Sequence, residues 1–385
     1  MLSSGDSLFN MDLFFELIQV ALQVRPALST TPTKEEWMEL YDVSQKQALL
    51  GIAYAAIELL PQSQKPDLSF LWAWSNDVKS IEDENLVHQK RCRQLLNNIY
   101  KNGFNAIIIK GQSLLPYYPK HLQNKRTPGD IDVWVTSEKG ATSPTPLKNI
   151  IDYAQSTLPK QYLCYIHYDF HVFSDIEVEL HIRPSFVCNP FYNLRLQKWF
   201  RALAAKIAIS GTSQKDIDLY ATKQICEEDQ AIILLLHIYK HMFETGIGFR
   251  QLLDLHLVLC SNSTSNIENI QTVLKTFGVS QFFTDIIYVL HNTFKYAPKD
   301  NQSILQFTPK QIERGEFLLN EIIQAGNFGH HDIRINHQGG QIRFAWEKLK
   351  HNFRLMHYYP QEVIWEPCYR LYHWTWRTFQ LWRFE

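Results

Sequence analysis

Apolar residues recur at helical spacing near the start of the chain, at Leu13, Phe14, Leu17, Ile18 and Ala21. The same pattern continues over residues 35–60, and prolines 61 and 66 then interrupt it. A charged amphipathic stretch over 77–100 predicts a long helix that ends at Gly103, since glycine is favoured just beyond a helix end. We interpret residues 1–103 as an N-terminal helical region that contains no catalytic set of residues.

The spacing of apolar residues changes to that of strands from residue 105 onward. An apolar strand over 106–109 leads into a Lys-Gly turn and a short helical piece, and a second strand begins at residue 130. A helix over 148–158 and two strand-like runs, 163–173 and 175–183, follow. This order of elements predicts a small α/β sheet.

Beyond Pro184 the pattern is again mostly helical, with helices expected over 227–244, after 246, over 283–294 and over 308–324. A Gly- and His-containing loop is expected at 327–340. We therefore predict an α+β protein in which a small mixed-sheet core (104–185) is flanked by an N-terminal (1–103) and a C-terminal (186–385) helical region. The sheet is too small to bury its own faces, so helices from both sides should pack against it.

The tail over 363–385 is rich in aromatic residues, among them Trp365, Trp374, Trp376 and Trp382. We expect it to dock as a helix, in a core or an interface. Base stacking is the alternative, but the tail lacks a dense basic pattern.

Composition narrows the choice of partners. The chain has a net charge of −1 and 45% hydrophobic residues. Without a global positive field, nucleic acid is not the expected partner. Six scattered cysteines without a C-x-x-C pair predict reduced thiols and a cytoplasmic protein. No secretory signal is apparent, and apolar runs such as 231–236 are too short to cross a bilayer, so no membrane partner is expected.

Two carboxylates at the start of the second strand are the candidates for a functional site. Side chains alternate across a strand, so Asp130 and Asp132 point to one face while Ile131 and Val133 point to the other. Adjacent carboxylates repel each other unless cations lie between them, and oxygen ligands suit hard divalent cations. A metal-dependent site is therefore the leading interpretation. In the last strand, one face carries Asp175, Glu177, Glu179, His181 and Arg183.

Three sequence elements carry a family resemblance: Lys110-Gly-Gln-Ser113, Arg126-x-x-Gly-Asp-x-Asp132 and Val178-Glu-Leu-His181. Together they resemble an uncharacterised bacterial nucleotidyltransferase family within the DNA polymerase β superfamily. His237, His241 and the stretch 246–254 also resemble that family.

The resemblance implies a fold and a mechanism. Asp130, Asp132 and Glu179 would bind two Mg²⁺ (or Mn²⁺) ions, with Glu179 as general base or as ligand of the second ion. The triphosphate of the NTP substrate, such as ATP, would be bound by a set of turn residues and cations: Lys110, Gly111, Gln112, Ser113, Arg126 and Gly129. The nucleoside monophosphate would pass to a hydroxyl of a small molecule or protein, with in-line attack.

Several alternatives stay open. Gln112 stands where the superfamily usually has serine, which favours a catalytically degenerate nucleotide-binding or protein-interaction scaffold of the same fold. A toxin-like transferase with a partner antitoxin is a third possibility. Glu177 competes with Glu179 for the role of third carboxylate.

Three further residues are ambiguous in the sequence. His237 and His241, at i and i+4, could bind a metal, although packing or hydrogen bonding to the catalytic core is favoured. Arg250 either forms an intrahelical ion pair with Asp254 or contacts substrate. We expect His237, His241 and Arg250 on helices that border a nucleotide cleft between the sheet and the C-terminal region.

Overall fold

The computed structural model describes residues 11–141, 143–210, 225–261, 267–298, 302–326 and 341–382. The predicted loop at 327–340 therefore lies outside the described residues. The N-terminal region consists of α1 (Met11–Ala21), α2 (Lys34–Lys46), α3 (Leu50–Leu59), η1 (Gln62–Gln64) and α4 (Leu68–Lys101). The helical pattern predicted over 35–60 is two helices, because Ala48 between them adopts a left-handed φ of 54°.

The long helix α4 has recognisable sequence signals at both ends. The Asp67 side chain caps it by accepting a hydrogen bond from the Phe70 backbone N–H at 2.9 Å. At its other end, Gly103 has a φ of 90°, a conformation that favours glycine. The predicted end of the helix at Gly103 is confirmed, while its start lies earlier than the amphipathic pattern indicated.

The four strands form one small mixed sheet in the order β1-β2-β4-β3. They are β1 (Phe104–Ile108), β2 (Ile131–Glu138), β3 (His167–Asp169) and β4 (Val178–His181). Strand β2 pairs antiparallel with β1 and parallel with β4, and β3 pairs antiparallel with β4. The connections contain η2 (Gly111–Tyr117), η3 (Gln123–Lys125) and α5 (Leu147–Thr157). The predicted α+β class with a small mixed sheet is confirmed.

The predicted strand over 163–173 is too long. Only His167–Asp169 form β3, because the segment before it folds back on itself. Leu163 and Tyr168 form an isolated antiparallel bridge, and the Cys164 N–H donates to the His167 carbonyl at 2.9 Å. The alternation of side chains continues through this turn, so periodicity alone could not reveal it.

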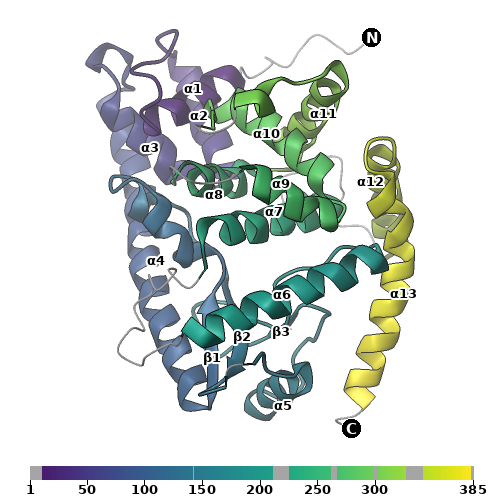
Figure 1. Cartoon of the computed structure of the whole chain (residues 1–385). Helices are drawn as coiled ribbons and strands as arrows, with labels where there is room; N and C mark the ends of the chain where they lie inside the picture. Colours follow the sequence, from purple (N-terminus) through teal and green to yellow (C-terminus); the bar gives the residue numbers. More distant parts are fainter. Residues whose placement is uncertain are drawn as a thin grey trace.

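The two faces of the sheet differ in chemistry. One is apolar and is covered by α4 and α5, whose residues Leu95, Ile99 and Ile150 join a hydrophobic cluster with Val133 and Leu180. The other face carries the acidic residues and lies toward α6 (Pro190–Ser210) and α7 (Glu227–Glu244), with α6 crossing the sheet in Figure 1. The predicted coverage by helices from both sides is confirmed.

The two helical regions share one hydrophobic cluster. The later helices are α8 (Phe249–Cys260), α9 (Ile267–Thr276), α10 (Ser280–Phe294), η6 (Gln302–Leu305), α11 (Pro309–Ala325), α12 (Gln341–Met356) and α13 (Pro360–Trp382). Helix α1 packs against both α3 and α10, as Figure 1 shows. The sheet is thus held in a frame built from both ends of the chain, and the boundaries at 103 and 185 stay a prediction. None of the described helices combines the length and apolar character that a membrane crossing requires.

The aromatic tail is a helix that docks along one side, as predicted, while Trp374 and Phe379 on it are exposed. Within α13, Tyr369 stacks on Phe186 with ring centroids 4.2 Å apart, and Trp376 meets Tyr165 edge-on at 5.7 Å. The Glu362 carboxylate accepts a hydrogen bond from the Cys188 N–H at 2.9 Å. These contacts join the tail to the residues just before β3 and to the segment that follows β4.

We predict that Gly51→Ala destabilises the protein. A Cβ at residue 51 would lie 2.2 Å from the Lys125 backbone carbonyl oxygen, which cannot move aside as a flexible side chain can. Alanine normally stabilises a helix relative to glycine by about 1 kcal/mol. Here we expect overpacking to lower the free energy of unfolding by about 1–3 kcal/mol, measured by urea denaturation. An unchanged or higher stability would show that α3 and η3 do not approach this closely.

Candidate active site

Three carboxylates meet on the polar face of the sheet. Asp132 on β2 and Glu179 on β4 are direct partners in the parallel register, and Asp130 immediately precedes β2. One oxygen from each of the three carboxylates lies within 4.8 Å of the others. The structure therefore brings together all three predicted carboxylates. Glu177, the alternative third carboxylate, is exposed and belongs to neither cluster of candidate metal ligands in the described residues.

Asp132 is buried, with 3% of its surface exposed, and is held by two cationic groups. Lys110 Nζ and His181 Nε2 each lie 2.7 Å from Asp132 Oδ1. Burial alone would raise the pKa of Asp132, but Lys110 and the hydrogen bond from His181 hold that pKa below its usual value. Asp132 is therefore ionised in the metal-free protein.

Glu179 lies between two histidines. Its Oε2 atom is 3.2 Å from His181 Nε2 and 3.0 Å from His167 Nδ1. Burial opposes ionisation, yet the contacts with His167 and His181 lower the pKa of Glu179. Burial also opposes charging of His167, but its contacts with Cys164 and Glu179 raise its pKa to about 10. Sequence reasoning missed His167: alternation separates it from the apolar face of Tyr168, but the pairing of β3 with β4, which brings it to Glu179, was not predicted.

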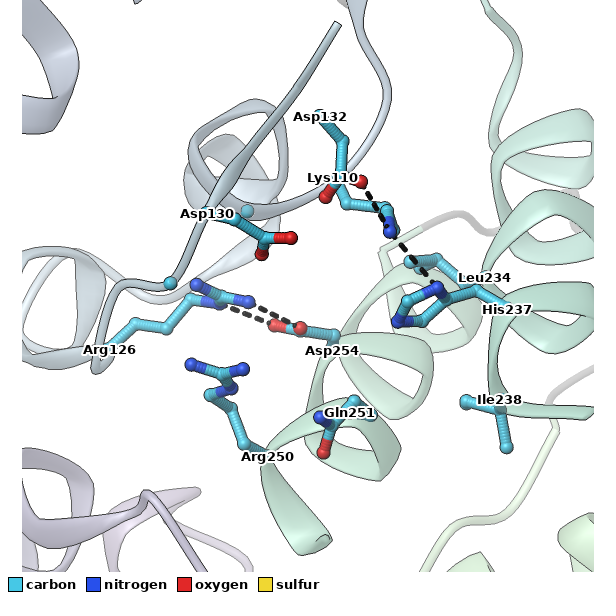
Figure 2. Close-up of a pocket in the computed structure, with 12 residues that line it drawn as sticks. Lys110, Arg126, Asp130, Asp132, Leu234, His237, Ile238, Arg250, Gln251 and Asp254 are labelled. Carbon is cyan, nitrogen blue, oxygen red and sulfur yellow. Dashed lines mark hydrogen bonds and ion pairs between the residues drawn. The ribbon is translucent and has the colours of Figure 1, made fainter. Parts of the chain in front are cut away.

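Asp130 differs from the other two carboxylates in its contacts. No hydrogen bond or ion pair to its carboxylate occurs within the described ranges, and Figure 2 shows it facing the space between Asp132 and Arg126. The negative charge of Asp132, followed by loss of hydration, raises the pKa of Asp130 to about 6. This carboxylate is the one that an added cation would stabilise most.

The predicted Lys-Gly turn positions Lys110. Gly111 has a φ of 61°, which a residue with a Cβ adopts only with strain, so the turn needs glycine. The turn directs Lys110 Nζ to Asp132 and, on its other side, to His237 Nδ1 at 3.0 Å (Figure 2). Burial and the Lys110 charge hold the pKa of His237 well below its usual value, so His237 is a neutral acceptor. The favoured interpretation, hydrogen bonding of His237 to the core, agrees with this contact.

His241 lies beside His237 on α7, with ring centroids 4.4 Å apart. Burial and the nearby charge of Lys240 hold the pKa of His241 well below its usual value. Neither histidine belongs to a cluster of candidate metal ligands among the described residues.

Gln112 and Ser113 are buried, and the hydrogen bonds of their side chains go to Asn85 and to the Lys110 backbone. The Gln112 side-chain amide donates to Asn85 Oδ1 on α4 at 3.0 Å, and its Oε1 has no hydrogen-bond partner in the part of the chain described. Ser113 Oγ donates to the Lys110 carbonyl at 3.3 Å. Neither residue lines the pocket beside Asp130, so contact of these side chains with phosphate stays a prediction that this arrangement does not favour.

Arg126 is committed to a buried ion pair. Its guanidinium binds both carboxylate oxygens of Asp254 on α8, at 2.8 and 2.7 Å, and Tyr118 donates to the same carboxylate at 2.6 Å. One alternative for Arg250 was an ion pair with Asp254. In the structure Asp254 pairs with Arg126 instead. Arg250 instead donates to the Thr127 and Pro128 carbonyls, at 3.1 and 3.0 Å.

Helix α4 also holds the segment before Asp130. Asn85 Nδ2 donates to the Arg126 carbonyl at 2.8 Å, and His88 Nε2 lies 2.8 Å from the Gly129 carbonyl. A Cβ added at Gly129 would make ordinary van der Waals contact with the Arg250 guanidinium, at 3.4 Å. Sequence reasoning missed Asn85 and His88, which look like ordinary polar residues of an amphipathic helix.

A narrow pocket lies between the sheet and the helices α7 and α8, where the cleft is predicted (Figure 2). Among its lining residues are the cations Lys110, Arg126 and Arg250 and the carboxylates of Asp130 and Asp132. Its free volume is about 30 Å³, which holds about two water molecules. Burial and repulsion from the nearby charge of Arg126 lower the pKa of Arg250 to about 10. This repulsion reflects the concentration of positive charge in the pocket beside the carboxylates.

The carboxylate cluster fits divalent cations of the Mg²⁺ or Mn²⁺ type. Its donors are carboxylate oxygens from Asp130, Asp132 and Glu179, the ligand class that such hard ions prefer. The raised pKa of Asp130 marks a local excess of negative charge, which a cation would relieve.

Comparison with known proteins assigns the family. The model of a family described as "Uncharacterised nucleotidyltransferase" matches residues 33–295, which is more than half of the chain. No curated protein and no solved structure matches the sequence. The chain belongs to this nucleotidyltransferase family, as its sequence motifs predict. The matched range contains the whole sheet together with the helices α4, α7 and α8 that surround the pocket.

We predict that Asp254→Asn destabilises the protein strongly. The substitution leaves the buried Arg126 guanidinium without its counter-charge, and breaking a buried pair typically costs about 3–5 kcal/mol. Denaturant unfolding measures this loss. Asp175→Asn, which breaks the more exposed Arg91–Asp175 pair, is the control and should change the stability much less. Equal effects of both substitutions would contradict a special role for the Arg126–Asp254 pair.

We predict that Asp130→Asn stabilises the metal-free protein above pH 6. The pKa of Asp130 rises from 3.8 to about 6 on folding, so the folded state binds more protons than the unfolded state between these values. Stability therefore falls as the pH rises from about 4 to about 6, and asparagine removes this loss. Thermal unfolding in a chelator at pH 8 and at pH 4 measures the effect, which should be large at pH 8 and small at pH 4. Glu177→Gln is the exposed control, and a similar gain in that variant would exclude charge relief at Asp130 as the cause.

Proposed function

We propose that this member of the family transfers a nucleoside monophosphate from an NTP to a hydroxyl group of a small molecule or protein. The observation that carries the proposal is the cluster of Asp130, Asp132 and Glu179 on one face of the sheet, beside a pocket lined by cations. Two divalent ions bound there would supply stabilisation of the negative charge that develops on the α-phosphate and the leaving pyrophosphate. ATP is one candidate donor.

The cations of the pocket fit the negatively charged part of such a substrate. Lys110 faces the pocket from the Lys-Gly turn, and Arg250 faces it from α8. Because the Arg126 fork is occupied by Asp254, we assign phosphate binding mainly to Lys110 and Arg250, while Arg126 keeps the loop in place. Gly111 and Gly129, which also line the pocket, leave the backbone accessible to phosphate oxygens.

Glu179 is better suited to bind a cation than to remove a proton. Its contacts with His167 and His181 lower its pKa, and a carboxylate with a lowered pKa is a weak base. We therefore favour Glu179 as a ligand over Glu179 as the general base for the acceptor hydroxyl.

A catalytically degenerate scaffold of the same fold is the second candidate. The observations that favour it are the narrow pocket, the buried side chain of Gln112 and the pairing of Asp132 with Lys110 and His181. In that case the cations Lys110 and His181 would neutralise Asp132 permanently, and no divalent ion would bind.

The test is nucleotide transfer from α-labelled NTPs, with Mg²⁺ or Mn²⁺ and a cell extract as the source of acceptor. We expect labelled product with the wild-type protein. Asp130→Asn and Asp132→Asn should each lower its rate about a hundredfold or more, because each removes charge at the position where ions stabilise the transition state. Asp130→Asn is the sharper variant, since it should lose activity while remaining at least as stable as the wild type.

Glu177→Gln is the matched control, because Glu177 is a neighbouring but exposed carboxylate, and the substitution should change the rate little. A severe loss in Glu177→Gln with a mild one in a Glu179→Gln variant would reverse the assignment of the third carboxylate. If no NTP is transferred, and no combination of NTP and divalent cation raises the melting temperature, the degenerate scaffold is the better description.

A further inference from the structure

A second cluster of possible metal ligands adjoins the three carboxylates. One donor atom from each of His167, Glu179 and His181 lies within 4.8 Å of the others. Glu179 Oε2 is 3.0 Å from His167 Nδ1 and 3.2 Å from His181 Nε2. Two nitrogens and one carboxylate oxygen thus converge on one point beside β3 and β4. We infer that His167, Glu179 and His181 form a site for a divalent transition-metal ion, separate in ligand chemistry from the all-carboxylate cluster.

Hydrogen bonding explains only part of this arrangement. His181 Nε2 has the geometry of a hydrogen bond to both Asp132 and Glu179. His167 Nδ1 is buried and makes no hydrogen bond among the described residues, although a carboxylate oxygen lies only 3.0 Å away. In the metal-free protein this contact is an imidazole–carboxylate pair, and the same spacing suits two ligands of one ion once binding of the ion has released the imidazole proton. Tetrahedral ligands with metal bonds of about 2.0–2.1 Å lie about 3.3 Å apart.

The backbone holds these donors in register. His167 and His181 are direct partners in the antiparallel pairing of β3 and β4, and their ring centroids lie 5.5 Å apart. Glu179 lies two residues before His181, so both side chains emerge on the same face of β4. Because three strand positions fix the cluster, its donors are preorganised without the need for a loop to close.

The ligand type selects the ion. Imidazole nitrogen suits Zn²⁺, Cu²⁺, Fe²⁺ and Ni²⁺, while Mg²⁺ and Mn²⁺ prefer oxygen ligands. Some catalytic zinc sites consist of two histidines and one carboxylate, which leave one position for water or substrate. We expect Zn²⁺ to bind more tightly than Mg²⁺ at this cluster.

The shared residue links this cluster to the carboxylates of the proposed active site. Glu179 belongs to both groups, and a carboxylate has two oxygens that can each bind an ion. The inference itself does not depend on nucleotidyl transfer, since the cluster can bind Zn²⁺ in a protein without transferase activity.

The test is Zn²⁺ binding by the full-length, chelator-treated protein. Calorimetric titration gives the affinity, and X-ray absorption of the bound zinc identifies imidazole ligands. We expect two imidazole rings in the wild type and one ring in His167→Ala, with an affinity lowered about tenfold or more. His167→Gln is a second variant that keeps a polar side chain on β3, and circular dichroism checks that both variants fold.

Two controls separate this inference from the proposed function. His171→Ala removes an exposed histidine close to β3 and should leave Zn²⁺ binding unchanged. Asp130→Asn should lower the rate of nucleotidyl transfer about a hundredfold or more and yet keep both imidazole ligands. The inference is overturned if folded His167→Ala and His167→Gln bind Zn²⁺ as the wild type does, or if the bound zinc has only oxygen ligands. Loss of Zn²⁺ binding in Asp130→Asn with retention in His167→Ala would assign the ion to the carboxylate cluster instead.

Discussion

The repulsion among three carboxylates at one corner of a small sheet is the constraint on which the surrounding structure depends. Two unit charges about 4 Å apart near a protein surface repel each other by about 4 kcal/mol. Lys110 and His181 oppose this repulsion at Asp132, and His167 and His181 oppose it at Glu179. Asp130 lacks such a partner within the described ranges, and its pKa is accordingly the one that rises. The unequal distribution of cations thus leaves the excess charge on the carboxylate that faces the pocket.

A frame of buried polar contacts keeps this corner in place. The segment that leads to Asp130 is held by α4 through Asn85 and by α8 through Asp254 and Arg250. Helix α4 precedes the sheet in the sequence and α8 follows it, and Asp254 lies 128 residues after Arg126. The position of the carboxylates therefore depends on the packing of both helical regions, which explains why the sheet does not stand alone.

The parts of the site that could be predicted from sequence are those set by local geometry. Strand alternation placed Asp130 and Asp132 on one face, and it placed Glu179 on the polar face of β4. The contacts of Gln112 and His167 were not predictable, because their partners, Asn85 and Glu179, are chosen by how separate segments pack. The i, i+4 spacing of Arg250 and Asp254 permits a local ion pair. Asp254 instead pairs with Arg126, which follows η3 and binds both oxygens of the Asp254 carboxylate.

The same logic accounts for the overestimated length of the strand that contains β3. An alternating pattern records which side chains are buried, and Leu163 and Tyr168 are both buried on either side of a turn. The start of strand pairing is decided by backbone hydrogen bonds, which the alternation of apolar and polar side chains does not reveal.

The position of Lys110 suggests how cation and nucleotide binding are connected in the proposed function. Its ammonium group is shared between Asp132, which is ionised, and His237, whose lowered pKa makes it a neutral acceptor. A divalent cation at Asp132 would compete directly with Lys110 for the same oxygen. Lys110 would then keep its contact with His237 at the pocket, where its charge is available to phosphate. Because each ligand favours the same rearrangement, binding of either should strengthen binding of the other by an equal factor.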